Sequence, residues 1–100
     1  MMIRVASAKD VAVGQMHVFD VEGTQVNVTN VDGHLYAFDD RCTHTGCSLS
    51  KGTLHGTTVT CPCHGSKFDV TSGAVLRGPA TRPLRSRLVQ VEHEALLTEA

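Results

Sequence analysis

The stretch Arg41–Asp69, "RCTHTGCSLSKGTLHGTTVTCPCHGSKFD", holds all four cysteines of the chain. Its two halves are built alike, because Cys42-x-His44 opens the first and Cys61-x-x-His64 opens the second. Sixteen residues separate His44 from Cys61. Thiolates and imidazoles are the protein ligands that suit zinc, copper and iron. The pattern therefore predicts a metal site that is held by two short loops, each of which supplies one sulfur and one nitrogen.

A single tetrahedral zinc ion is the main alternative, since two cysteines and two histidines satisfy it in number. Zinc sites usually pair cysteine with cysteine and histidine with histidine along the chain. Here each loop mixes the two ligand types, at spacings of two and three residues. Mixed pairs favour a binuclear centre in which each loop reaches both metals.

Length and composition predict one ordinary globular domain over residues 1–100, because 41% of the residues are apolar and 19% are charged. No apolar run approaches the roughly 18 residues that cross a bilayer, and the start lacks the pattern of a secretory signal. We therefore expect a soluble, cytoplasmic protein without a membrane anchor. Thiols stay reduced in that compartment, which favours metal ligands over a disulfide framework.

Most of the chain alternates apolar and polar residues with period two, which predicts short antiparallel strands and a mainly β fold. The expected strands cover residues 3–7, 15–20, 24–30, 34–39, 57–61, 87–92 and 95–99. Asp32-Gly33 has the composition of a tight hairpin turn, and a second hairpin is expected across His93 and Glu94. Ser7 is placed to cap the one helical turn that we expect.

Charge is distributed unevenly along the chain. Residues 41–91 carry seven basic side chains and one acidic side chain, a net charge of +6, whereas the remainder has a net charge of −7. One interpretation is a chance distribution of charges over a solvated surface. The imbalance is also what an electrostatic docking face around the metal-binding loops requires.

The segments "CTH" and "CPCHG" resemble the signature of the Rieske iron–sulfur proteins, and "GPATRPL" at Gly78–Leu84 is similar to the proline-containing loop that covers the cluster in that family. The resemblance implies a Rieske-like antiparallel β-sandwich with a small cluster-binding subdomain made of two loops, at about residues 41–80. It also implies one [2Fe–2S] cluster per chain. By position, Cys42 and Cys61 correspond to the ligands of one iron, and His44 and His64 to those of the other.

The ligand types set the charge of such a centre. Two ferric ions with two sulfides carry a charge of +2, so two thiolates leave the oxidised centre neutral, whereas four would leave it at −2. A neutral centre accepts an electron more readily, which places the Rieske range of about −150 to +300 mV above the roughly −400 mV of plant-type ferredoxins. Each imidazole also keeps a second ring nitrogen that can gain or lose a proton.

The resemblance assigns roles to further residues. It implies a disulfide between Cys47 and Cys63, whereas the expected compartment favours two reduced thiols. High-potential members have a serine and a tyrosine that donate hydrogen bonds to sulfur; this chain has Ser66 and Phe68 there, which predicts an intermediate potential. Pro79 belongs to the covering loop. The remaining histidines have no ligand partners and are expected at the surface: His17, His34, His55 and His93.

We find no nucleophile–base pair, phosphate-binding loop or nucleotide-binding fingerprint. The resemblance therefore implies an electron-transfer protein rather than an enzyme. We expect it to be a monomer when isolated and to have no nucleic-acid partner. Its expected role is to carry one electron from a flavin reductase to a terminal oxygenase. The alternative is a fixed Rieske subunit of a larger redox enzyme, such as an NAD(P)H nitrite reductase or a respiratory complex.

Overall fold

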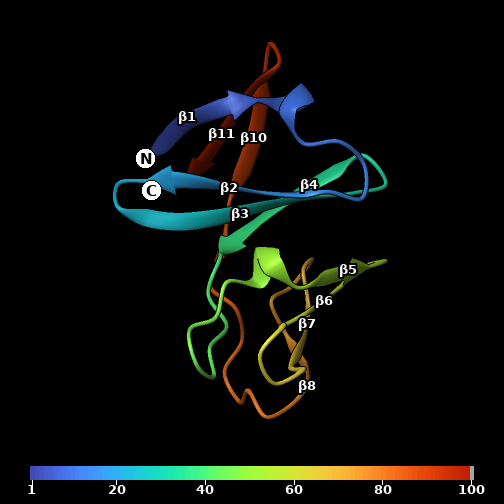
Figure 1. Ribbon diagram of the computed structural model, residues 1–100. Coiled ribbons are helices and arrows are strands. Elements are labelled where there is room, and N and C mark those ends of the chain that lie inside the picture. Colours follow the sequence, from blue (N-terminus) through green and yellow to red (C-terminus); the bar gives the residue numbers. More distant parts are fainter. Residues whose placement is uncertain (100) are drawn as a thin grey trace.

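The computed structural model describes residues 1–99 and consists of three antiparallel sheets (Figure 1). The first sheet has the order β1 (Met2–Ser7), β11 (Ala95–Glu99), β10 (Val89–Glu92). The second has the order β2 (Met16–Val21), β3 (Thr24–Val31), β4 (His34–Asp39), β9 (Ser86–Arg87). The third has the order β5 (Thr53–His55), β6 (Thr58–Thr60), β7 (Lys67–Asp69), β8 (Val75–Arg77). The helical segments are the 3₁₀ turns η1 (Ala8–Asp10) and η2 (Leu49–Lys51), and no helix within residues 1–99 is long and apolar enough to cross a membrane.

The turns form where the sequence predicts them. Asp32 and Gly33, between β3 and β4, both have positive φ, at 53° and 92°. His93 and Glu94, between β10 and β11, have φ values of 48° and 67°. Two successive residues with positive φ match the right-handed twist of the strands that they join. Ser7 caps η1, since its hydroxyl accepts a hydrogen bond from the Lys9 N–H at 3.3 Å.

Strand β3 is covered on both faces. Val26 and Val28 are fully buried and belong to an upper core with Val11, Val21, Ala37 and Leu96. Asn27 and Thr29 alternate with these valines, point to the opposite face, and are equally buried. The third sheet and its loops lie on that side, below the second sheet in Figure 1. β3 is therefore the central strand between an upper two-sheet body and a lower subdomain.

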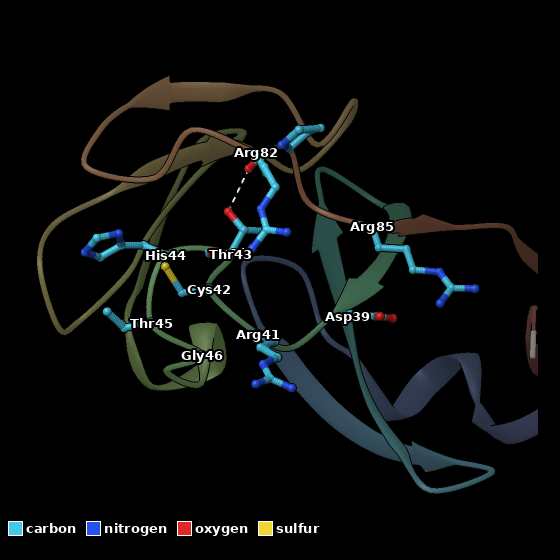
Figure 2. Close-up of a pocket in the computed structure, with 10 residues that line it drawn as sticks. Asp39, Arg41, Cys42, Thr43, His44, Thr45, Gly46, Arg82 and Arg85 are labelled. Carbon is cyan, nitrogen blue, oxygen red and sulfur yellow. Dashed lines mark hydrogen bonds between the residues drawn. The ribbon is translucent and has the colours of Figure 1, made fainter.

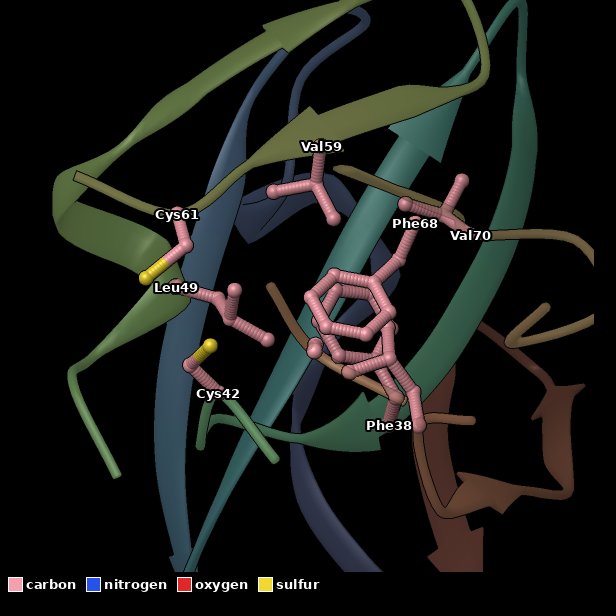
Figure 3. Close-up of a cluster of buried hydrophobic side chains, with 9 residues drawn as sticks. Phe38, Cys42, Leu49, Val59, Cys61, Phe68 and Val70 are labelled. Carbon is pink, nitrogen blue, oxygen red and sulfur yellow. The ribbon is translucent and has the colours of Figure 1, made fainter. Parts of the chain in front are cut away.

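The lower subdomain has a core of its own (Figure 3). Its buried members are Phe38, Cys42, Leu49, Val59, Cys61, Phe68, Val70, Ala80 and Leu84. Phe38 lies on β4, whereas the others come from the loops and strands of residues 42–84. Two of the cysteines that the sequence singles out are thus part of an apolar core.

The sequence prediction missed the small strands. β5, β7 and β8 have three residues each and β9 has two, which is too short for a period-two pattern to emerge. Strand β6 is three residues long, inside the five residues that the sequence predicts. The third sheet forms because these segments pair with one another and cover the lower core. This stabilisation comes from tertiary contacts, which a local sequence pattern does not show.

Candidate metal centre

The two cysteine–histidine loops have the same backbone geometry. In the first loop the Cys42 N–H donates to the Cys47 carbonyl at 2.8 Å, and the Gly46 N–H donates to the Cys42 carbonyl at 2.8 Å. In the second loop Cys61 N–H donates to the Ser66 carbonyl at 2.8 Å, and Gly65 N–H donates to the Cys61 carbonyl at 3.2 Å. Each turn ends on a glycine with positive φ, 80° at Gly46 and 76° at Gly65, a conformation that favours glycine.

The first cysteine of each loop is buried and carries a free thiol. Cys42 and Cys61 are each 2% exposed, and Figure 3 shows their sulfur atoms near one another at the edge of the lower core, beside Leu49. Burial raises the pKa of the Cys61 thiol, and the adjacent Cys42 thiol raises it further, while the backbone N–H groups of Cys63 and His64 act in the opposite direction. The structure brings together the two thiols that the sequence predicts as ligands.

The two predicted histidine ligands lie at the exposed end of the same loops. His44 and His64 are both exposed, and their ring centroids are 5.3 Å apart in an edge-to-face arrangement. Figure 2 shows the His44 ring projecting from the loop that carries Cys42. The loops thus present a buried pair of sulfurs and, beside it, an exposed pair of imidazoles.

The remaining cysteines form a disulfide between the two loops. Cys47 and Cys63 are bonded, with their Cα atoms 6.5 Å apart. The Cys61 sulfur lies within 4.8 Å of both bridge sulfurs. A disulfide sulfur is not a thiolate, so this close trio is not a ligand set of three. The bridge implied by the resemblance is present, and it fixes the separation of the two loops.

Residues 1–90 match the Rieske [2Fe-2S] domain. The chain belongs to the Rieske [2Fe-2S] family. The ferredoxin component of the naphthalene 1,2-dioxygenase system of Pseudomonas putida is 33% identical over 91 residues, which cover 91% of this chain and 88% of the relative. That of biphenyl 2,3-dioxygenase from Rhodococcus jostii is 34% identical over 98 residues, which cover 98% and 92%.

Solved Rieske ferredoxin structures superpose on nearly the whole chain. The ferredoxin of carbazole 1,9a-dioxygenase from Nocardioides aromaticivorans has a TM-score of 0.92 and 31% identity, over 98% of this chain and 96% of its own. The Rieske protein described here is thus an electron-transfer protein with a [2Fe–2S] cofactor.

The residues of this chain fit that cofactor. Burial and the adjacent Cys42 thiol disfavour the thiolate of Cys61 by raising its pKa. A cationic iron–sulfide core would offset thiolate charge at this site, and neutral imidazole ligands would add none. The remaining histidines lie away from this site. His34 on β4, His55 on β5 and His93 in the β10–β11 turn are at the surface. His17 lies on β2, and its ring is hydrogen-bonded to the Gln15 side chain.

A third loop, Gly78–Leu84, is fastened to both ligand loops of the Rieske protein. The buried Ser66 hydroxyl accepts a hydrogen bond from the Ala80 N–H at 3.0 Å, and the Thr43 hydroxyl donates to the Arg82 carbonyl at 2.7 Å. Because Ser66 accepts there, its own hydroxyl hydrogen is free to donate elsewhere. Pro79, which follows a cis peptide bond, is exposed in this loop, and Phe68 is completely buried in the lower core.

A buried carboxylate joins the lower subdomain to the upper body. Asp40, 7% exposed, accepts hydrogen bonds from the Ser50 N–H at 2.7 Å, the Ser50 hydroxyl at 2.7 Å and the Asn27 side-chain amide at 3.1 Å. The Thr29 hydroxyl donates to the side-chain amide oxygen of Asn27 at 2.8 Å. Sequence reasoning missed this network; the polar residues within the apolar strand at 24–30 were the available signal.

Proposed function

We propose that this Rieske protein carries single electrons from a flavin reductase to the terminal oxygenase of a ring-hydroxylating system. The observation that carries the proposal is the exposed histidine pair, His44 and His64, beside two buried thiols. An electron carrier needs a redox centre that is shielded from water yet close to a surface that partners can reach. The relatives are named ferredoxin components of dioxygenase systems, and one similar structure is a complex of the oxygenase and ferredoxin of carbazole 1,9a-dioxygenase.

We propose Cys42 and Cys61 as the ligands of one iron, and His44 and His64 as the ligands of the other. The equivalent positions in two identically hydrogen-bonded loops support this assignment. The cofactor supplies reversible one-electron chemistry when bound. The buried cysteines exclude water from the site. The exposed histidine rings would lie between the centre and a docked partner.

We further propose that residues 1–100 form one domain, with the cluster-binding region at about residues 41–80. The chain leaves the second sheet after β4, forms the lower subdomain and returns to pair with β4 as β9, and the Asp40 network joins Asn27 to Ser50; both observations support a single unit. A cytoplasmic location is also part of the proposal. The Cys47–Cys63 bridge departs from the reduced thiols expected in that compartment, so this proposal requires the bridge to resist cellular reductants.

The fixed-subunit alternative draws on one observation, the Cys47–Cys63 bridge, which the resemblance associates with quinol-oxidising members of higher potential. A subunit that stays bound to its enzyme requires a large apolar interface, whereas a carrier must dissociate after each electron. Purification separates the two cases, since a carrier leaves its partner in 1 M salt and a fixed subunit does not.

Reconstitution tests the proposed function directly. A flavin reductase and a terminal ring-hydroxylating oxygenase should be purified separately and mixed with NADH and an aromatic substrate, with and without the Rieske protein. We expect product formation to depend on the Rieske protein and to rise with its concentration until the oxygenase is saturated. Equal rates with and without it would overturn the proposal.

A further inference from the structure

An open depression lies beside the first ligand loop, between residues 41–46 and the third loop (Figure 2). Its volume is about 480 Å³. His44 forms part of its wall, so a group bound there lies beside the exposed His44 imidazole. More basic than acidic side chains line this depression.

Three arginines line the depression: Arg41, Arg82 and Arg85. All three side chains are exposed. Asp39 is the acid in the lining, and its carboxylate forms an ion pair with the buried Arg87. The other ion pair within residues 1–99 is Lys9–Glu94, so none of the three arginines has a carboxylate partner there. The charge of this surface is thus available to another molecule.

The backbone holds these arginines in place. Arg82 exchanges two contacts with Thr43, since its carbonyl accepts from the Thr43 hydroxyl at 2.7 Å and its Nη2 donates to the Thr43 carbonyl at 3.4 Å. The Arg85 carbonyl accepts from the Asp39 N–H at 3.1 Å. The Arg41 guanidinium lies against Gly46, where an added Cβ would be 3.1 Å from Arg41 Nε. The guanidinium groups of Arg82 and Arg41 thus each contact a neighbouring loop, so these two side chains lose less conformational freedom when they bind a carboxylate.

We propose that this depression receives an acidic segment of the oxygenase, with aspartate or glutamate carboxylates between Arg41, Arg82 and Arg85. The proposal rests on the proposed function and extends it by naming the surface and the partner's chemistry. Planar guanidinium groups bind carboxylates through two parallel hydrogen bonds, so arginines give both charge and orientation. An acidic segment held there would set the oxygenase surface against His44, where the electron leaves.

The depression includes only some of the basic residues in the segment 41–91, for which the sequence indicates a docking face. Arg82 lines the depression, whereas Lys51 and Lys67 do not. Lys67 donates to the Thr60 hydroxyl at 3.1 Å, and Lys51 lies on η2. Arg77 on β8 is an exposed arginine of the same subdomain that is also absent from the lining, which makes it the matched control.

A fluorescently labelled hexaglutamate peptide tests the proposal on the oxidised, cluster-loaded protein at low ionic strength. Fluorescence anisotropy should show saturable binding, and Arg41→Gln, Arg82→Gln and Arg85→Gln should each weaken it by roughly three- to ten-fold, as charge-assisted hydrogen bonds imply. Arg77→Gln should change the dissociation constant by less than about two-fold. Unchanged visible spectra will show that the cluster is intact in every variant.

Absence of saturable binding would overturn the proposal. So would equal weakening by Arg77→Gln and Arg82→Gln, or full competition by free glutamate at the same carboxylate concentration, because both indicate general charge screening. The proposed function is tested separately by reconstitution. If the arginine variants lose peptide binding but the protein does not support oxygenase turnover, the depression stands as an acidic-segment site and the proposed function fails.

Discussion

Replacing Asp40 should uncouple the lower subdomain from the upper body. Asp40→Ala removes the acceptor of three hydrogen bonds and leaves one buried donor of Asn27 and two part-buried donors of Ser50 without this partner. An unpaired buried donor costs about 1–3 kcal/mol, and part-buried donors lie at the low end of that range, so we expect a loss of about 3–5 kcal/mol. Asp40→Asn keeps one carbonyl oxygen for two of the donors and should cost only about 1–2 kcal/mol, from the lost charge. In a domain of this size, 1 kcal/mol shifts the melting temperature by about 4–8 °C.

Thermal unfolding, followed by circular dichroism and visible absorbance, should therefore place Asp40→Ala at least about 12 °C below the wild type, with Asp40→Asn between them. All proteins must be scanned at one rate, because cluster loss makes unfolding irreversible. Asp20→Ala is the control, since the exposed Asp20 carboxylate also accepts two hydrogen bonds, from Gly23 and Gln25. The reasoning fails if Asp40→Ala melts within about 3 °C of the wild type or no lower than Asp20→Ala.

Two further predictions concern the loops. Cys47 and Cys63 in denatured, cluster-stripped protein should resist alkylation until a reductant is added, as judged by mass spectrometry; free labelling would disprove the bridge. In cluster-free protein, burial raises the pKa of the Cys61 thiol above that of an exposed thiol. An acid with a raised folded-state pKa loses stability as pH rises through that pKa, so the urea midpoint should fall in alkali, and a constant midpoint would contradict the stated burial.

The larger elements of the fold could be predicted because their signals are local. Strands β1–β4, β10 and β11 have enough residues for period two to show, and the Asp32-Gly33 and His93-Glu94 turns carry the residue types that tolerate positive φ. The pairing of Asp39 with Arg87 lies beyond such reasoning, since the two residues are 48 positions apart. A local pattern contains no information about contacts at that separation.

The meeting of two cysteines and two histidines on matching loops could also be predicted, because the sequence repeats these two residue types at short spacings. The hydrogen bonds that hold these loops in place could not be predicted. The Ser66–Ala80 and Thr43–Arg82 hydrogen bonds join residues 14 and 39 positions apart. Asn27 is buried although it alternates with valines, as a solvent-facing residue would, because the lower subdomain covers the second face of β3.

The central claim is that two cysteines and two histidines hold a [2Fe–2S] cluster, and metal analysis joined to electron paramagnetic resonance tests it most directly. Purified protein should contain two irons and two acid-labile sulfides per chain. After dithionite reduction, its signal should show hyperfine coupling to the nitrogens of His44 and His64. Cys42→Ser should lower cluster occupancy, and the surface change His55→Ala should not. Stoichiometric zinc without sulfide, or a reduced signal without nitrogen coupling, would contradict the account.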